Sequence, residues 1–460
     1  MSKDVSRRAF LQHSTALSLA GGALPFVMNL AAIGEAAAST ATDYKAIVCV
    51  FMFGGNDYAN TVVPVDPANY ALYQQFRPNL ATPQASLAAT TLNPVSALSG
   101  GRQFALAPQL APLMPIFDAG KMAVMLNVGP LIQATTKAQF SAGSVRLPPK
   151  LQSHNDQQSL WQAFAPEGAV TGWGGRIGDL LQSTNGNAAL TCVNPSGNAV
   201  FLAGNSAVQY AISTAGPIPL TARTSLQGSA AAATALRNLV STPATPHIFD
   251  VEHTKVTKRA LDLYDQVNTA LAGGPTINTV FPAAADPGSS LGRQLQQVAR
   301  LISVSAQLGL KRQVFFVSSG KFDLHGGLPT VHPMLLSNVA DAMRAFYDTT
   351  VELGVSNQVT TFTASDFGRA LVPNNDGSDH GWGSHHFVVG GAVKGKAFYG
   401  TPPIIADNGP DDIGQGRLLP TTSVDQYAGT IASWFGVSPT DLTTVIPNIN
   451  NFAVKNLGFV

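Results

Sequence analysis

Five short apolar runs in this chain are each followed by a polar loop, and this pattern restricts the fold more than any other feature. The runs span residues 46–53, 122–128, 313–319, 358–364 and 387–389. Continuous apolar runs of this length are typical of strands that are buried on both faces of a parallel sheet. We expect helices between them, one over 293–308 and one that begins at Pro333 and runs to about residue 353. This alternation predicts an α/β fold with an open, mainly parallel sheet and helices on both faces.

The segment from about 181 to 246 differs from the rest, because it is rich in Ala, Ser, Thr, Asn and Gly and has few charges. This composition predicts a small insertion or cap on the sheet. No repeat or long polar linker divides the remainder, so we expect residues 39–460 to form one domain. Residues 372–383 are predicted to be a loop, because Pro373-Asn374-Asn375-Asp376-Gly377 has the chemistry of a turn.

The first 38 residues have the layout of a signal peptide. Arg7 and Arg8 precede an apolar stretch over about 16–32, and small residues up to Ala38 supply a cleavage site. The stretch contains Gly and Pro and has no second apolar run behind it, which favours a cleaved signal over an anchor. We therefore expect a twin-arginine signal peptide, the twin-arginine translocase as a partner during export, and a periplasmic or secreted mature protein.

Only 12% of the residues are charged, and the mature part is expected to be nearly neutral. A chain without a basic field does not hold a polyanion, so nucleic acid is not an expected partner. The two cysteines, Cys49 and Cys192, are too few for a disulfide framework. We expect both to pack in the core as small apolar residues.

Acidic and imidazole side chains follow several of the predicted strands. Asp57 follows the strand over 46–53, Asp323 and His325 follow that over 313–319, and Asp366 follows that over 358–364. Sites in open α/β sheets form outside the carboxyl ends of the strands. Carboxylates and imidazoles from separate loops are the ligands that divalent cations such as zinc require. The sequence therefore predicts a divalent metal site at this edge of the sheet.

A second group of such side chains lies further along the chain, where Asp379, His380, His385 and His386 fall within eight residues. Groups of this kind seldom cluster without a site, so we also expect metal ligands here.

Three of the acids also have structural interpretations. Asp57 can be a turn residue, and Asp366 can cap a helix that begins near Phe367. Asp323 can serve only to orient a structural histidine, His325.

Ser153 is the candidate nucleophile, because it precedes a predicted helix start where backbone N–H groups could receive an oxyanion. A role as a plain helix N-cap is the alternative for Ser153. Thr61 is a weaker candidate, and no nucleotide-binding fingerprint is present.

These motifs together resemble the domain-of-unknown-function 1501 family, exported proteins of the alkaline phosphatase and sulfatase superfamily. The resemblance is carried by the motifs Ser6-Arg7-Arg8, Phe53-Gly54-Gly55-Asn56-Asp57, Ser153-His154-Asn155-Asp156, Leu291-Gly292-Arg293, Phe322-Asp323-Leu324-His325, Ser365-Asp366-Phe367-Gly368-Arg369 and Asp379-His380-Gly381. It implies an alkaline-phosphatase-like fold.

The resemblance also implies a site with two divalent metal ions, with zinc as the expected metal. Asp57, Asp379 and His380 would hold one ion beside Ser153. Asp323, His325 and a late histidine, His386 or its neighbour His385, would hold the second.

Two functions of different classes follow. The first is an exported metal-dependent hydrolase of small phosphate or sulfate esters. The alternative is a non-catalytic binding or assembly protein of the cell envelope that keeps the fold but not the activity.

Overall fold

The computed structural model describes residues 41–219, 224–283, 291–406 and 408–460. The predicted signal peptide, with Arg7, Arg8 and the cleavage position at Ala38, lies outside these residues. Within them, no helix combines the length and the apolar character that crossing a membrane would need.

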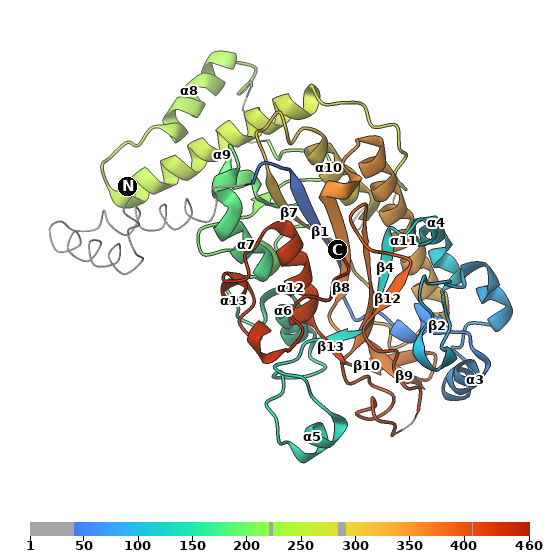
Figure 1. Ribbon diagram of the computed structural model, residues 1–460. Coiled ribbons are helices and arrows are strands. Elements are labelled where there is room, and N and C mark those ends of the chain that lie inside the picture. Colours follow the sequence, from blue (N-terminus) through green and yellow to red (C-terminus); the bar gives the residue numbers. More distant parts are fainter. Residues whose placement is uncertain (1–40, 220–223, 284–290, 407) are drawn as a thin grey trace, which may run out of the picture.

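A nine-stranded sheet forms the centre of the molecule (Figure 1). Strand β1, Lys45–Met52, lies inside it and pairs in parallel with β7, Arg312–Ser319, and with β8, Val359–Ser365. The order is β12-β4-β11-β8-β1-β7-β5-β6, with β13 beside β4, and β11 runs antiparallel to both of its neighbours. The other strands are β4 (Met122–Gly129), β5 (Cys192–Asn194), β6 (Tyr210–Ala211), β11 (Ser384–Gly390), β12 (Ala397–Tyr399) and β13 (Thr422–Ser423). The predicted α/β class with a mainly parallel sheet is confirmed, and each of the five predicted strands is present.

Both faces of the sheet are buried, because successive side chains of a strand point to opposite faces. In β1, Val48 and Val50 belong to one apolar core, and Ile47 and Cys49 belong to the other. The first core is covered by three helices, α4 (Met114–Asp118), α10 (Leu291–Ser303) and α11 (Leu328–Glu352). The second core, on the other face, is covered by α6 (His154–Ala163), α7 (Trp173–Leu181), α12 (Val424–Phe435) and α13 (Leu442–Val445) (Figure 1). Cys49 and Cys192 are free thiols buried in the second core, as predicted.

Three local predictions need correction. Helix α10 ends at Ser303 and not near residue 308, because residues 304–309 form turns. Helix α11 begins at Leu328 and not at Pro333, because Pro329 already occupies its first turn, where a missing N–H costs nothing. Residues 372–383 are not only a loop, since β9 (Arg369–Asn374) and β10 (Gly377–His380) form an antiparallel hairpin. The predicted turn chemistry closes this hairpin, with Asn375 at a positive φ of 54°.

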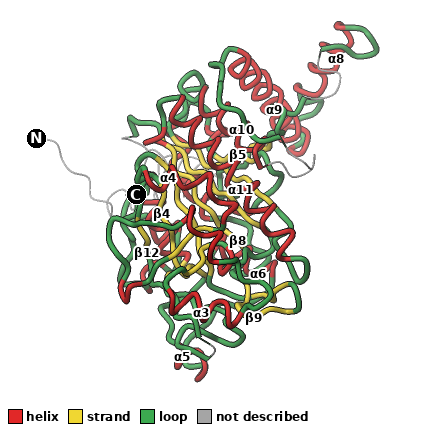
Figure 2. Tube along the Cα trace, turned by 90° about the vertical axis from the view of Figure 1, so that its right-hand side faces the viewer, coloured by secondary structure: helices red, strands yellow, loops and turns green. Residues whose placement is uncertain are grey.

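The segment over 181–246 is only partly the insertion that its composition predicts. Its strands β5 and β6 extend the edge of the central sheet beyond β7. Helices α8 (Ala230–Ser241) and α9 (Ile248–Ala272) then pack against each other. Helix α8 stands away from the body of the molecule (Figure 2), whereas the later part of α9 contributes Leu263, Val267 and Ala270 to the first core. The remaining elements are α3 (Pro67–Phe76), α5 (Lys137–Ala142) and a two-stranded sheet of β2 (Val62–Pro64) and β3 (Phe104–Leu106).

Candidate metal centre

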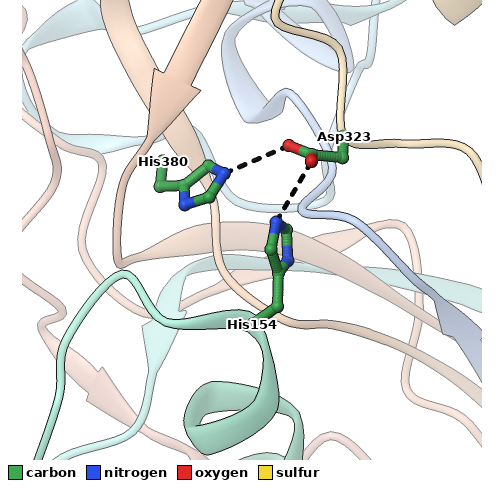
Figure 3. A group of neighbouring side chains, drawn as sticks. All are labelled: His154, Asp323 and His380. Carbon is green, nitrogen blue, oxygen red and sulfur yellow. Dashed lines mark hydrogen bonds and ion pairs between the residues drawn. The ribbon is translucent and has the colours of Figure 1, made fainter.

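His154, Asp323 and His380 meet beyond the carboxyl ends of β7 and β8 (Figure 3). His154 is the first residue of α6, Asp323 lies in the loop after β7, and His380 ends β10. One ligand atom from each lies within 4.8 Å of the other two. Asp323 is central, with Oδ2 3.3 Å from His154 Nε2 and Oδ1 3.1 Å from His380 Nε2.

The other ring nitrogen of each histidine is held by an acceptor. Nδ1 of His154 lies 2.6 Å from Asp366 Oδ2, and Nδ1 of His380 lies 2.8 Å from the carbonyl oxygen of Gln152. Because both partners accept hydrogen bonds, we assign the ring proton of each neutral imidazole to Nδ1. Both Nε2 lone pairs are then directed at the Asp323 carboxylate, the arrangement that orients histidines as metal ligands.

The surroundings shift the pKa values of these two histidines in opposite directions. The hydrogen bond from His154 to Asp366 raises the pKa of His154, with a smaller opposing effect from burial. Burial lowers the pKa of His380, which favours its neutral form.

His325 places a third imidazole beside Asp323 and His380. Its Nε2 lies 3.1 Å from Asp323 Oδ1 and only 2.9 Å from Nε2 of His380, while its Nδ1 lies 3.3 Å from Asp379 Oδ1. Two lone pairs at such a separation repel each other unless a proton or a cation is shared between them. Ligands at about 2.0–2.1 Å from a tetrahedral zinc ion are about 3.3 Å apart, close to the spacings found here. The donor set therefore fits a divalent cation of the zinc type.

Arg369 forms an ion pair with the Asp323 carboxylate. Its buried guanidinium donates from one terminal nitrogen to Asp323 Oδ1 at 2.8 Å. Burial acts to raise the pKa of Asp323, but the hydrogen bond and the charge of Arg369 outweigh it, so this pKa is lowered. Asp323 is therefore held ionised, as a metal ligand must be.

Two glycines allow the loop that carries Asp323 and His325 to reach its place. Gly54 has a φ of 117°, and a Cβ there would lie 2.3 Å from the backbone nitrogen of Asp323. A Cβ on Gly377 would lie 2.2 Å from the carbonyl carbon of His325. Any other side chain at either position would displace this loop.

Asp57 does not take part in this cluster, and its predicted role as a metal ligand is corrected. Its two carboxylate oxygens accept hydrogen bonds from Arg77 at 2.5 and 2.8 Å, and both side chains are fully buried. Arg77 also donates to the carbonyl oxygens of Ala370 and Leu371, so the pair ties the β1 loop to β9. Both Asp57 oxygens are thus used by a structural ion pair.

His386 and His385 also lie elsewhere, which corrects their prediction as late ligands. His386 is fully buried in the core under α6 and α12, with its ring 4.7 Å from that of Trp161. His385 accepts a hydrogen bond from the backbone N–H of Asn127 through Nδ1. Burial lowers the pKa of each of these histidines to about 3, so both are neutral core residues.

Ser153 is the N-cap residue of α6, but its hydroxyl bonds no backbone N–H of that helix. It donates instead to Asp156 Oδ2 at 2.8 Å and is turned toward its own helix. The role of Ser153 as nucleophile stays a prediction. Thr61 is buried and donates to the carbonyl oxygen of Asp57, which is a structural position.

Sequence reasoning gave no role to His154 or Arg369, and it left Asp366 open between a metal ligand and a helix cap. His154 lies in the Ser153-His154-Asn155-Asp156 motif, which was interpreted through the Ser153 hydroxyl and not through the imidazole beside it. Asp366 neither caps a helix nor belongs to the group itself, because its Oδ2 lies beside Nδ1 of His154 and also accepts from Gln158 at 2.8 Å. Arg369 has no distinguishing pattern of its own in the sequence.

Comparison with known families supports the resemblance seen in the motifs. A family model described as "Protein of unknown function (DUF1501)" matches residues 44–446. The chain belongs to this family. The span that the DUF1501 model matches includes all residues of the cluster and the strands that carry them. A search of the curated proteins finds no match.

Solved structures with a related arrangement share little sequence with this DUF1501 protein. Ps i-CgsB, in complex with k-i-k-neocarrahexaose, is 9% identical over 89% of this chain and 77% of its own, with a TM-score of 0.36. The lipoteichoic acid synthase LtaP from Listeria monocytogenes is 8% identical over 90% of this chain and 78% of its own, with a TM-score of 0.33. A mutant of the alkaline phosphatase PafA is 9% identical over 72% of this chain and 64% of its own, with a TM-score of 0.27. Likeness this distant carries no inference about a reaction.

Proposed function

We propose that this protein is a divalent-metal-dependent hydrolase of phosphate or sulfate esters, with a single metal centre. The observation that carries the proposal is the convergence of the Nε2 atoms of His154, His325 and His380 on the carboxylate of Asp323. Three imidazoles and one carboxylate form a donor set suited to zinc. A single centre is favoured because Arg77 already neutralises Asp57, a carboxylate that a second ion would need.

A divalent ion held there would act as a Lewis acid that polarises an ester oxygen and offsets the charge of the attacking group. Asp366 and the carbonyl oxygen of Gln152 fix the imidazoles of His154 and His380, so two donors are oriented before anything binds. The side chains of Asp323 and His325 are 43% and 46% exposed. An ester group can therefore approach the centre directly from solvent.

The nucleophile in this proposal is either Ser153 or a water molecule. Ser153 lies next to His154, and its hydroxyl donates to the Asp156 carboxylate in this structure. Attack by Ser153 would require its hydroxyl to turn from Asp156 toward the centre.

Metal analysis of the purified mature protein tests the proposal. We expect about one equivalent of zinc per chain, and loss of metal together with hydrolysis of an aryl phosphate or aryl sulfate in His154→Ala and His380→Ala. His253→Ala is the matched control, since His253 is an exposed histidine of α9. Absence of bound metal in the parent protein would favour the alternative function, a non-catalytic binding or assembly protein of the envelope.

We also propose that the protein acts outside the cytoplasm, in the periplasm or after secretion, and reaches it through the twin-arginine translocase. This proposal rests on Arg7, Arg8 and the apolar stretch that follows them.

A further inference from the structure

We propose that Arg369 is a positioning residue that sets the distance between Asp323 and His380, an inference that rests on the proposed metal centre. Arg369 is the first residue of β9, and its side chain is fully buried beneath the cluster. A guanidinium has no lone pair to offer a cation, so Arg369 acts on a bound ion only through its bond to Asp323 and its bonds to the backbone.

The guanidinium of Arg369 joins three chain segments that meet at the centre. One terminal nitrogen donates to Asp323 Oδ1 at 2.8 Å, in the loop after β7, and to the carbonyl oxygen of Gly54 at 2.9 Å, in the loop after β1. Nε donates at 2.9 Å to the carbonyl oxygen of Ser378 in β10, and the second terminal nitrogen donates to the same oxygen. These segments are far apart in sequence, so their relative position depends on such cross-links.

The contact between Arg369 and Ser378 matters because Ser378 lies two residues before His380 on the short strand β10. His380 is the register partner of Arg369 across the hairpin, and the pairing shifts between Ser378 and His380. The bonds from Arg369 to the carbonyl oxygen of Ser378 therefore hold β10 at the residue next to this irregularity and help to set where His380 stands. The same planar group holds Asp323 by its carboxylate. A rigid guanidinium thus sets the separation of two proposed ligands, which a flexible ammonium with a single nitrogen cannot do.

Arg77 provides a matched comparison within the same region. It is as deeply buried as Arg369, also pairs with an aspartate, and also donates to backbone carbonyl oxygens, those of Ala370 and Leu371. Its partner Asp57 is not among the proposed ligands. Arg77→Lys and Arg369→Lys therefore impose the same chemical change at two equally buried arginines, and only the second touches a proposed ligand.

The experiment measures zinc affinity by competition with a chromophoric chelator, and thermal unfolding, for the mature parent protein and both lysine variants. We expect Arg369→Lys to weaken zinc binding about 10- to 100-fold, whereas Arg77→Lys stays within about 3-fold of the parent although both variants unfold at lower temperature. The visible spectrum of the cobalt-substituted Arg369→Lys protein should also change in its d–d bands, because the geometry of the ligands changes.

The outcomes separate the two proposals. Equal zinc affinity and an unchanged cobalt spectrum in Arg369→Lys would overturn the role of Arg369 while leaving the metal centre intact. Absence of zinc binding by the parent would overturn the metal centre, and the role of Arg369 with it. If Arg369→Lys does not fold, Arg369→Gln takes its place. It keeps a planar donor group but is too short to bond Asp323 and the carbonyl oxygen of Ser378 together, so parent-like zinc affinity in it would count against the proposal.

Discussion

Nδ1 of His154 lies 2.6 Å from Oδ2 of Asp366, and this contact joins the first turn of α6 to the carboxyl end of β8. Asp366 is fully buried and also accepts from the backbone N–H of Gly54. A buried carboxylate that orients an imidazole in this way strengthens the imidazole as a ligand without touching the ion.

Asp366→Asn should therefore weaken zinc binding about 10- to 100-fold while the protein stays folded. An amide can present its NH₂ group to His154, and the ring proton then moves to Nε2, where it blocks the lone pair. Isothermal titration with zinc measures the effect, with the exposed Asp118→Asn as control. Parent-like affinity in Asp366→Asn would show that the ring of His154 is not oriented by this contact.

The ion pair of Arg77 with Asp57 should matter for stability and not for metal content. Arg77→Met leaves a buried carboxylate without a partner, and we expect it to lower the free energy of unfolding by about 3–5 kcal/mol. Asp57→Leu combined with Arg77→Met should recover part of that loss, because no buried charge remains. Denaturant unfolding gives the free energies, and elemental analysis should find the same zinc content in all proteins that fold. Loss of zinc in the double variant would reinstate Asp57 as a ligand.

Ser153→Gly distinguishes a nucleophile from a structural serine. Glycine tolerates the N-cap backbone conformation but cannot attack an ester, so a nucleophilic Ser153 predicts loss of turnover by orders of magnitude with zinc content preserved. Ser153→Ala serves as the second variant, and it should cost about 0.5–1.5 kcal/mol through loss of the hydrogen bond to Asp156 if the residue is only structural. Turnover of an aryl phosphate at the parent rate by the glycine variant would assign the attack to water.

Replacing Arg7 and Arg8 together with lysine should leave the precursor in the cytoplasm, because the twin-arginine receptor reads the guanidinium pair and not charge alone. Fractionation of cells followed by immunoblotting measures this. Export of the Lys-Lys precursor at the normal level would remove the basis for the proposed route.

Asp425, in the first turn of α12, predicts a pH dependence of stability. Burial raises its pKa to about 7 despite a hydrogen bond from Ser423. The folded state then keeps a proton that the unfolded state loses near pH 4, so stability falls as pH rises through this window, by up to about 1.4 kcal/mol per pH unit, and levels off above pH 7. Asp425→Asn has no such proton, so its melting temperature relative to the parent should be higher at pH 8 than at pH 5. A constant difference across this range would contradict the assignment.

The strands and the edge at which the site forms could be predicted because they depend on local pattern. Apolar runs such as that of β1 mark a buried strand whatever surrounds them, and Asp323, His325 and His380 follow from the rule that sites form at the carboxyl ends. The division of the carboxylates between ligands and ion pairs could not be predicted. Asp57 and Asp323 have equivalent positions after their strands, and the difference lies in which arginine reaches each one through the fold.

The histidines show the same limit. His386 and His380 are both candidates by residue type, yet a register in β11 that directs His386 into the apolar core removes it from the centre. Such a register depends on pairing with β4, which is more than two hundred residues away in the chain. Likewise, the place of His154 beside Asp323 depends on α6 starting opposite Asp366, which no local pattern specifies.

The place of β1 in the sheet has a consequence for synthesis of the chain. Lys45 at its start pairs with Arg312 in β7, and its other neighbour, β8, begins only at Val359. A ribosome adds about 5–20 residues per second, so the first strand waits on the order of tens of seconds before either partner has been made. Throughout that interval, its apolar residues are without their final neighbours and are available to a chaperone. The central sheet, and with it the centre at its edge, can assemble only when translation is nearly complete.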